Sequence, residues 1–160
     1  MIMTSEMSIP RLTLKGIDML QSFTLKHRNS AVAELVNEAL LNGVDEDGLN
    51  KHDWMIRRDV KASLETYHNK IRVLSQLKSR LPQKVGDDEY VKLVAKLFQR
   101  TPSETVVNQL VQLKSHGIRQ IDVVNEHGLE TSNINRLVKR YINIEILAKK
   151  TIVEIFILPS

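Results

Sequence analysis

The stretch GIRQIDVVNEHGLETSNINRLVKRY, residues 117–141, contains two short runs of helical periodicity separated by a glycine and a leucine. The first run covers Gln120 to His127. Gly128 then supplies a residue that easily adopts the left-handed backbone conformation, and Leu129 is expected to be buried beneath the turn. In the second run, apolar residues recur at i, i+3, i+4 and i+7, which places them in one stripe on a helix: Ile134, Leu137, Val138 and Tyr141. The pattern predicts two helices joined by a tight turn.

The opposite face of the second helix is polar and cationic. Its amide and guanidinium groups suit the edges of bases, and its charges suit phosphates. These residues are Ser132, Asn133, Asn135, Arg136, Lys139 and Arg140, and Gln120 begins the first helix. The arrangement is typical of a helix-turn-helix that binds double-stranded DNA. A merely solvated face on an ordinary helical hairpin is the alternative, and it stays open on the sequence alone.

The rest of the chain is also expected to be helical. With 160 residues, 42% of them apolar, the chain is long enough for two small domains with cores. Sheets are disfavoured by the 4% of aromatic residues and by only six glycines and four prolines. Residues 81–88 are typical of a linker, and Asp87 is expected to stabilise the start of the helix that follows. We predict an all-α protein of two helical domains in tandem, residues 1–80 and 81–160.

The two halves of the chain share their helical spacing. A shift of 74 residues without gaps places Gly43 on Gly117 and Tyr67 on Tyr141. Duplication and a coincidence of helix spacing both account for this. In the same register Trp54 falls on Gly128, so a second helix-turn-helix in residues 1–80 would be divergent.

A long helix is predicted in the first half, where an apolar stripe recurs at helical spacing: Val60, Leu64, Tyr67, Ile71 and Leu74. This helix is also strongly basic. The segment from Arg57 to Arg80 carries seven basic residues against Asp59 and Glu65, a net charge of +5. Its expected role is contact with DNA phosphates, or else it is a solvated face. The candidate DNA-binding residues at its start are Arg57, Arg58 and Lys61.

Residues 102–144, PSETVVNQLVQLKSHGIRQIDVVNEHGLETSNINRLVKRYINI, resemble regulators of bacterial adhesin (fimbrial) operons of the PapB type. The likeness extends from about Val91 to Leu147 and includes Ser103, Val106, Leu110, Gly117, Val123, Gly128, Lys139 and Arg140. A shorter set is similar to plasmid repressors of the KorA (TrfB) type: Gly117, Gln120, Gly128, Leu129, Val138 and Arg140. The resemblance implies sequence-specific DNA binding by an oligomer at operon control regions, through the second helix of the motif.

Other classes of function have little support. There are no cysteines, and the five histidines are scattered, so we expect no metal site and no cofactor. Motifs for nucleotide binding or a catalytic nucleophile are lacking, so we expect no enzyme and no small-molecule substrate. No apolar run is long enough for a membrane span, and a cytoplasmic location is expected. The prediction is a transcriptional regulator with a net charge of +4; the alternative is a helical protein-interaction adaptor that binds no nucleic acid.

The segment from Thr151 to Ser160 is apolar and rich in β-branched residues. Such a patch is costly to leave in water, so we expect it to be an oligomerisation element formed by Ile152, Ile155, Phe156 and Leu158. The alternative is that it packs back onto the chain's own helices.

Overall fold

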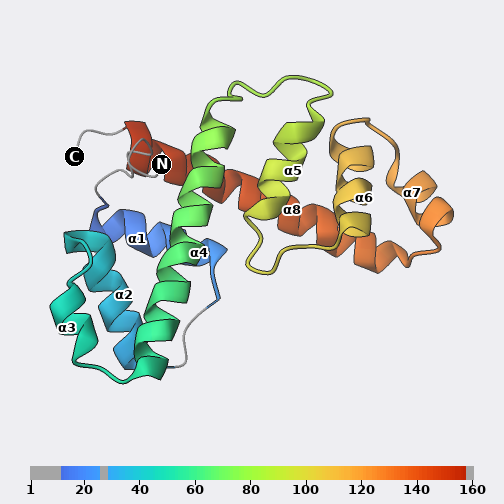
Figure 1. The fold of residues 1–160 in the computed structure, drawn as a ribbon. Coiled ribbons are helices and arrows are strands. Elements are labelled where there is room, and N and C mark those ends of the chain that lie inside the picture. Colours follow the sequence, from blue (N-terminus) through green and yellow to red (C-terminus); the bar gives the residue numbers. More distant parts are fainter. Residues whose placement is uncertain (1–11, 26–28, 158–160) are drawn as a thin grey trace, which may run out of the picture. The chain divides into compact units, whose positions relative to one another are not determined.

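The computed structural model describes residues 12–25 and 29–157, and every element of secondary structure within these ranges is a helix. The all-α prediction is therefore confirmed (Figure 1). The α-helices are α1 (Leu14–Leu20), α2 (Ser30–Asn42), α3 (Glu46–Asn50), α4 (Trp54–Lys78), α5 (Asp88–Lys96), α6 (Glu104–Lys114), α7 (Gln120–His127) and α8 (Thr131–Ile152). A 3-10 turn, η2 (Gln21–Phe23), follows α1, and a π-helical turn, η3 (Val153–Ile157), continues α8. No helix within the described ranges has both the length and the apolar character needed to cross a membrane.

The chain divides into two compact units. Unit 1 consists of the residues up to Arg72 together with those from Thr151 onward, and unit 2 is Val73–Lys150. The boundaries fall inside α4 and near the end of α8, whereas the sequence suggested a division at the linker, between residues 80 and 81. Unit 1 is thus built from two separate segments of the chain.

Side chains at the helix starts explain where several helices begin. Thr13 accepts a hydrogen bond from the backbone N–H of Gly16 at 3.0 Å and caps α1. Asn29 caps α2 in the same way, and Asp45 caps α3. In unit 2, Asp87 accepts from the N–H of Tyr90 at 3.1 Å, which confirms its predicted place at the start of α5. Each such bond satisfies a backbone donor that has no partner within its helix.

The core of unit 1 contains the apolar stripe predicted for α4. Leu64 and Tyr67 are buried, as are Phe23 before α2 and Val32 on it. The hydroxyl of Thr24 lies 3.5 Å from the phenolic oxygen of Tyr67, which links the end of η2 to the middle of α4. Helical periodicity thus identified the buried face of α4 correctly.

Part of the apolar C-terminal segment is buried within unit 1, as the alternative to the oligomerisation element expected, while Val153 is 43% exposed and Phe156 is half-buried. Ile152 is the last residue of α8 and is 1% exposed, and Ile155 on η3 is 8% exposed. Both belong to unit 1, where η3 packs on α1. A Cβ placed on Gly16 would lie only 3.1 Å from Cγ2 of Ile155, so the two elements approach closely. Leu158, named above as part of the oligomerisation element, lies outside the described residues.

Unit 2 is built around the part of α8 that precedes Thr151. The phenol of Tyr90 on α5 donates a hydrogen bond to Glu145 on α8, and α6 contacts both α5 and α7. Figure 1 shows α8 running behind α5 and α6 to reach α7. Tyr90, Leu110 and Tyr141 are fully buried in this unit. The unit therefore presents one long helix supported by three shorter ones.

Candidate nucleic-acid interface

The connection between α7 and α8 has the geometry that Gly128 was expected to provide. Gly128 adopts φ 64° and ψ 37°, the left-handed conformation, and its N–H donates to the carbonyl of Val124. The N–H of Leu129 donates to the same carbonyl at 3.0 Å. The chain then enters α8 at Thr131, so the two helices are separated by only three residues. The predicted bounds of the first helix and the positive φ of Gly128 are confirmed.

A small apolar cluster holds α7 and α8 together. Val123, Val124 and Ile134 are buried, and partly buried residues pack against them: Leu113, Ile118, Leu129, Leu137 and Val138. These side chains come from α6, α7, the turn and α8, so the cluster fixes the start of α8 on the rest of unit 2.

The polar face of α8 is exposed and divides into two rows along the helix. One row borders a groove and is called the groove row: Asn133, Arg136 and Arg140. The other, called the outer row, consists of Ser132, Asn135 and Lys139. All six candidate DNA-binding residues of α8 are therefore exposed on one side of the helix, opposite the buried Ile134 and Tyr141.

The groove has a volume of about 450 Å³ and lies between α8, α6 and the loop that follows α5. Arg100 in that loop lines it together with Phe98 and Pro102. The guanidinium carbon of Arg140 is 5.4 Å from the centre of the Phe98 ring, a cation–π contact that holds the arginine at the edge of the groove. Sequence reasoning missed Arg100 and Phe98, since neither belongs to the periodic pattern of the motif.

Gln120, the remaining candidate in unit 2, is exposed as the first residue of α7. The preceding residue, Arg119, pairs with Asp122 at 3.0 Å. The hydrogen bonds that Arg119 donates to Asp122 raise the pKa of the Arg119 guanidinium.

The three candidates on α4 lie in unit 1 and differ from one another. Lys61 is exposed. Arg58 is exposed too, but it stacks 5.1 Å from the centre of the Trp54 ring and lies 3.2 Å from Asp59. Arg57 is half-buried, and its Nε is buried without a hydrogen-bond partner among the described residues. Of the three candidates, Lys61 is the one best placed to reach a phosphate.

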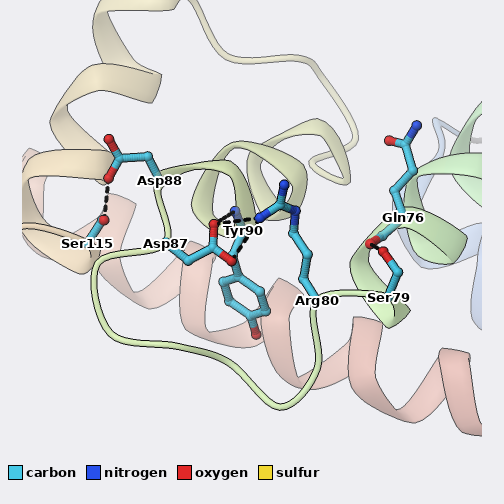
Figure 2. Close-up of polar contacts among 7 residues, drawn as sticks. All are labelled: Gln76, Ser79, Arg80, Asp87, Asp88, Tyr90 and Ser115. Carbon is cyan, nitrogen blue, oxygen red and sulfur yellow. Dashed lines mark hydrogen bonds and ion pairs between the residues drawn. The ribbon is translucent and has the colours of Figure 1, made fainter.

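The basic segment from Arg57 to Arg80 does not form one cationic face. Lys70 is 8% exposed, and burial lowers the pKa of its ammonium group. Arg80 lies beyond the end of α4, where its Nη1 is 2.9 Å and 3.1 Å from the two carboxylate oxygens of Asp87 (Figure 2). The net charge of +5 was counted along the sequence and does not describe the surface of the helix.

The connection between α2, α3 and α4 repeats only part of what is seen in α6, α7 and α8. Gly43 and Gly117 both have positive φ, 90° and 68°, and Glu46 and Gln120 begin α3 and α7 at the predicted shift of 74 residues. Trp54, however, is already the first residue of α4, and Asp53 caps that helix through the N–H of Ile56. The turn in unit 1 is therefore built differently.

A serine, a histidine and an aspartate meet where α5 begins and α6 ends. The hydroxyl of Ser115 donates to Asp88 Oδ1, and Nε2 of His116 lies 3.1 Å from the same oxygen (Figure 2 shows the Ser115 contact). The serine hydrogen bond, followed by that of the histidine, lowers the pKa of Asp88. Both donors converge on the carboxylate, whereas in a catalytic triad the histidine stands between serine and acid. The cluster joins two helices.

The described part of the chain contains no group of three or more histidine, cysteine or acidic side chains that could share a metal ion. Comparison with family models, with curated proteins and with solved structures gives no significant match.

Proposed function

We propose that the chain is a sequence-specific DNA-binding transcriptional regulator, in which α7, the Gly128 turn and the start of α8 act as a helix-turn-helix. The observation that supports this most directly is the position of six polar or cationic side chains on one exposed side of α8. A helix of this kind fits the major groove, where asparagine and arginine side chains recognise base edges and lysine contacts phosphates.

Successive turns of α8 receive different tasks in this proposal. Asn135 and Arg136 lie in the first turns after the connection, where helix-turn-helix proteins contact base edges. Lys139 and Arg140 lie about one turn further on and act mainly through phosphates. Gln120, at the start of α7, contacts the DNA backbone. No catalytic step is part of the proposal.

The proposal can be tested by selecting bound fragments from random-sequence duplex DNA and measuring their affinity by fluorescence anisotropy over a series of salt concentrations. A regulator gives an enriched sequence and an affinity that falls steeply with salt. Arg136→Ala should weaken binding to that sequence by about 1 to 3 kcal/mol. The matched control is Lys92→Ala on α5, which removes the same charge from the same unit and should leave the affinity nearly unchanged.

The contribution of unit 1 needs its own variant, since this unit includes the C-terminal segment and cannot be isolated by cutting at residue 80. The double variant Arg58→Ala, Lys61→Ala in the full chain removes the two exposed candidate cations of α4. A lower affinity together with a reduced salt dependence would assign phosphate contacts to unit 1. An unchanged affinity would restrict DNA binding to unit 2.

From the resemblance to PapB-type and KorA-type regulators, we propose that the regulator acts as a homo-oligomer at an adhesin or plasmid-borne operon; the proposed location is the cytoplasm, as the sequence predicts. Two copies would present two recognition helices to successive half-sites. The competing function is a helical adaptor that binds only proteins. Failure to bind either duplex DNA or heparin at low salt would favour the adaptor.

A further inference from the structure

The groove beside α8 has the features of a small-molecule site in addition to its place next to the proposed DNA-binding helix. We propose that it binds a small organic carboxylate with an aromatic body, and that this ligand competes with DNA. Only the competition rests on the proposed function, because the binding itself follows from the groove.

The volume and the apolar lining of the groove suit an apolar body. Its volume of about 450 Å³ falls within the range of sites that bind small organic ligands. The apolar surface that a ligand can cover belongs to the half-buried side chains of Val106, Leu129 and Leu137, because Phe98 and Ile134, which also line the groove, are each 1% exposed. Covering such apolar surface with an aromatic ring removes it from water and is favourable.

The rim of the groove suits an anion. Arg100, Arg136 and Arg140 all line it, and none of its described lining residues is acidic. Guanidinium groups bind carboxylates through paired hydrogen bonds, which are stronger than those between neutral groups. An inorganic anion would leave the apolar surface of Val106 and Leu137 uncovered, and a neutral hydrocarbon would leave the arginines without a counter-charge. An aromatic carboxylate would cover this surface and pair with the arginines.

The ligand and DNA would share two arginines. Arg136 and Arg140 belong to the groove row that is proposed to contact DNA, so a carboxylate bound between them neutralises charges that the DNA requires. Arg100 lines the groove but lies on the loop after α5, and Asn135 lies in the outer row, outside the groove. Variants of Arg100 and Asn135 therefore test ligand binding and DNA binding separately.

The binding is tested with 2-naphthoate as the probe, titrated into the full chain by isothermal calorimetry at constant ionic strength. We expect 2-naphthoate to bind at least about tenfold more tightly than the neutral 2-naphthamide, since a charge-assisted hydrogen bond contributes that much. Acetate, which lacks the body, should give no measurable binding. Arg100→Gln should weaken 2-naphthoate about tenfold, whereas Lys92→Gln should leave it unchanged. Equal binding of acid and amide, or no binding of 2-naphthoate, would overturn the site.

The competition is tested by anisotropy with a selected duplex. We expect 2-naphthoate, and not 2-naphthamide, to raise the apparent dissociation constant for DNA, and DNA to weaken 2-naphthoate by the same factor, because coupling between two ligands is reciprocal. Arg100→Gln should preserve the affinity for DNA and abolish the inhibition by 2-naphthoate. Asn135→Ala should weaken DNA binding and keep the inhibition by 2-naphthoate. Simultaneous binding without mutual effect would overturn the competition. A chain that binds 2-naphthoate but no DNA would overturn the proposed function and leave the ligand site standing.

Discussion

The phenolic oxygen of Tyr90 lies 2.7 Å from Oε2 of Glu145 and donates a hydrogen bond that joins α5 to α8. Tyr141, one turn before Glu145 on α8, is equally buried, but its hydroxyl has no hydrogen-bond partner among the described residues. Two buried tyrosines in one unit thus differ in whether their hydroxyl is satisfied. This difference allows the value of the Tyr90 contact to be measured.

We expect Tyr90→Phe to lower the free energy of unfolding by about 1 to 3 kcal/mol, because the Glu145 carboxylate, whose side chain is 16% exposed, loses this donor and keeps the ammonium of Lys149, 3.9 Å away. Tyr141→Phe removes a hydroxyl that is already unsatisfied, so it should be neutral or slightly stabilising. Urea unfolding of both variants at neutral pH measures the two effects. Equal losses in both variants would contradict the assigned hydrogen bond.

The same tyrosines predict a loss of stability at alkaline pH. Burial, followed by the charge and hydrogen bond of Glu145, raises the pKa of Tyr90, and burial raises that of Tyr141. In the unfolded chain a tyrosine ionises near pH 10. Because the folded pKa values are higher, this stabilisation is present below pH 10 and is lost as the pH rises above it.

Urea midpoints measured between pH 8 and pH 11 should therefore be level at first and then decline, and the decline should be smaller in the Tyr90→Phe, Tyr141→Phe double variant. An identical decline in that variant would assign the alkaline transition to other groups.

The third prediction concerns the positive φ of Gly128. A branched side chain is strained at a positive φ, so Gly128→Val should destabilise the protein by about 1 to 3 kcal/mol. Gly128→Asn is the matched control, since asparagine tolerates the left-handed conformation far better. Thermal unfolding should show a clear loss for valine and a smaller one for asparagine. Equal midpoints for the two variants would mean that the turn does not need this conformation.

Two residues of the outer row of α8, Lys139 and Asn135, should differ in how their variants respond to salt. Lys139→Ala should weaken binding to all duplexes similarly and reduce the slope of log affinity against log salt by about one, because one phosphate contact is lost. Asn135→Ala should cost about 1 to 3 kcal/mol at the selected sequence and leave the slope unchanged. Anisotropy titrations on specific and random duplexes distinguish the two. A change of base preference in Lys139→Ala would contradict its role as a phosphate contact.

The packing of the C-terminal segment on unit 1 gives the last prediction. Ile155→Ala removes a buried side chain near Gly16 and should cost about 2 to 4 kcal/mol. Val153→Ala, two residues earlier, changes a side chain that is 43% exposed and should change stability by less than about 0.5 kcal/mol. Light scattering should give the same mass for Ile155→Ala and the unaltered chain. A lower mass for the variant would support the predicted role of this segment in self-association.

Local features were predictable from the sequence because they depend on neighbouring residues. Periodicity located the buried stripe of α4, Asp87 marked the start of α5, and Gly128 marked a left-handed turn. Each follows from residues within two turns of one another. The exposure of Asn135 and Arg136 was predictable for the same reason, since it follows from the apolar stripe on the other side of α8.

Features that depend on distant residues were not predictable. Whether Ile155 is exposed depends on Gly16, which lies at the other end of the chain, and no local pattern connects the two. Lys70 was counted with the charged surface because the sequence does not show that its position on α4 is buried. Arg100 has no periodic neighbours, and its place in the groove follows only from the packing of α6 against α8.

The discontinuity of unit 1 affects the order in which a growing chain can complete its folding. Ribosomes synthesise the residues up to Arg72 first, then all of unit 2, and only afterwards Ile152 and Ile155. Unit 2 therefore has its full sequence while α1 still lacks the segment that covers Gly16. Until that segment emerges, the nascent protein exposes an apolar surface to chaperones and to other chains. The half of the protein that is made first is the half that is finished last.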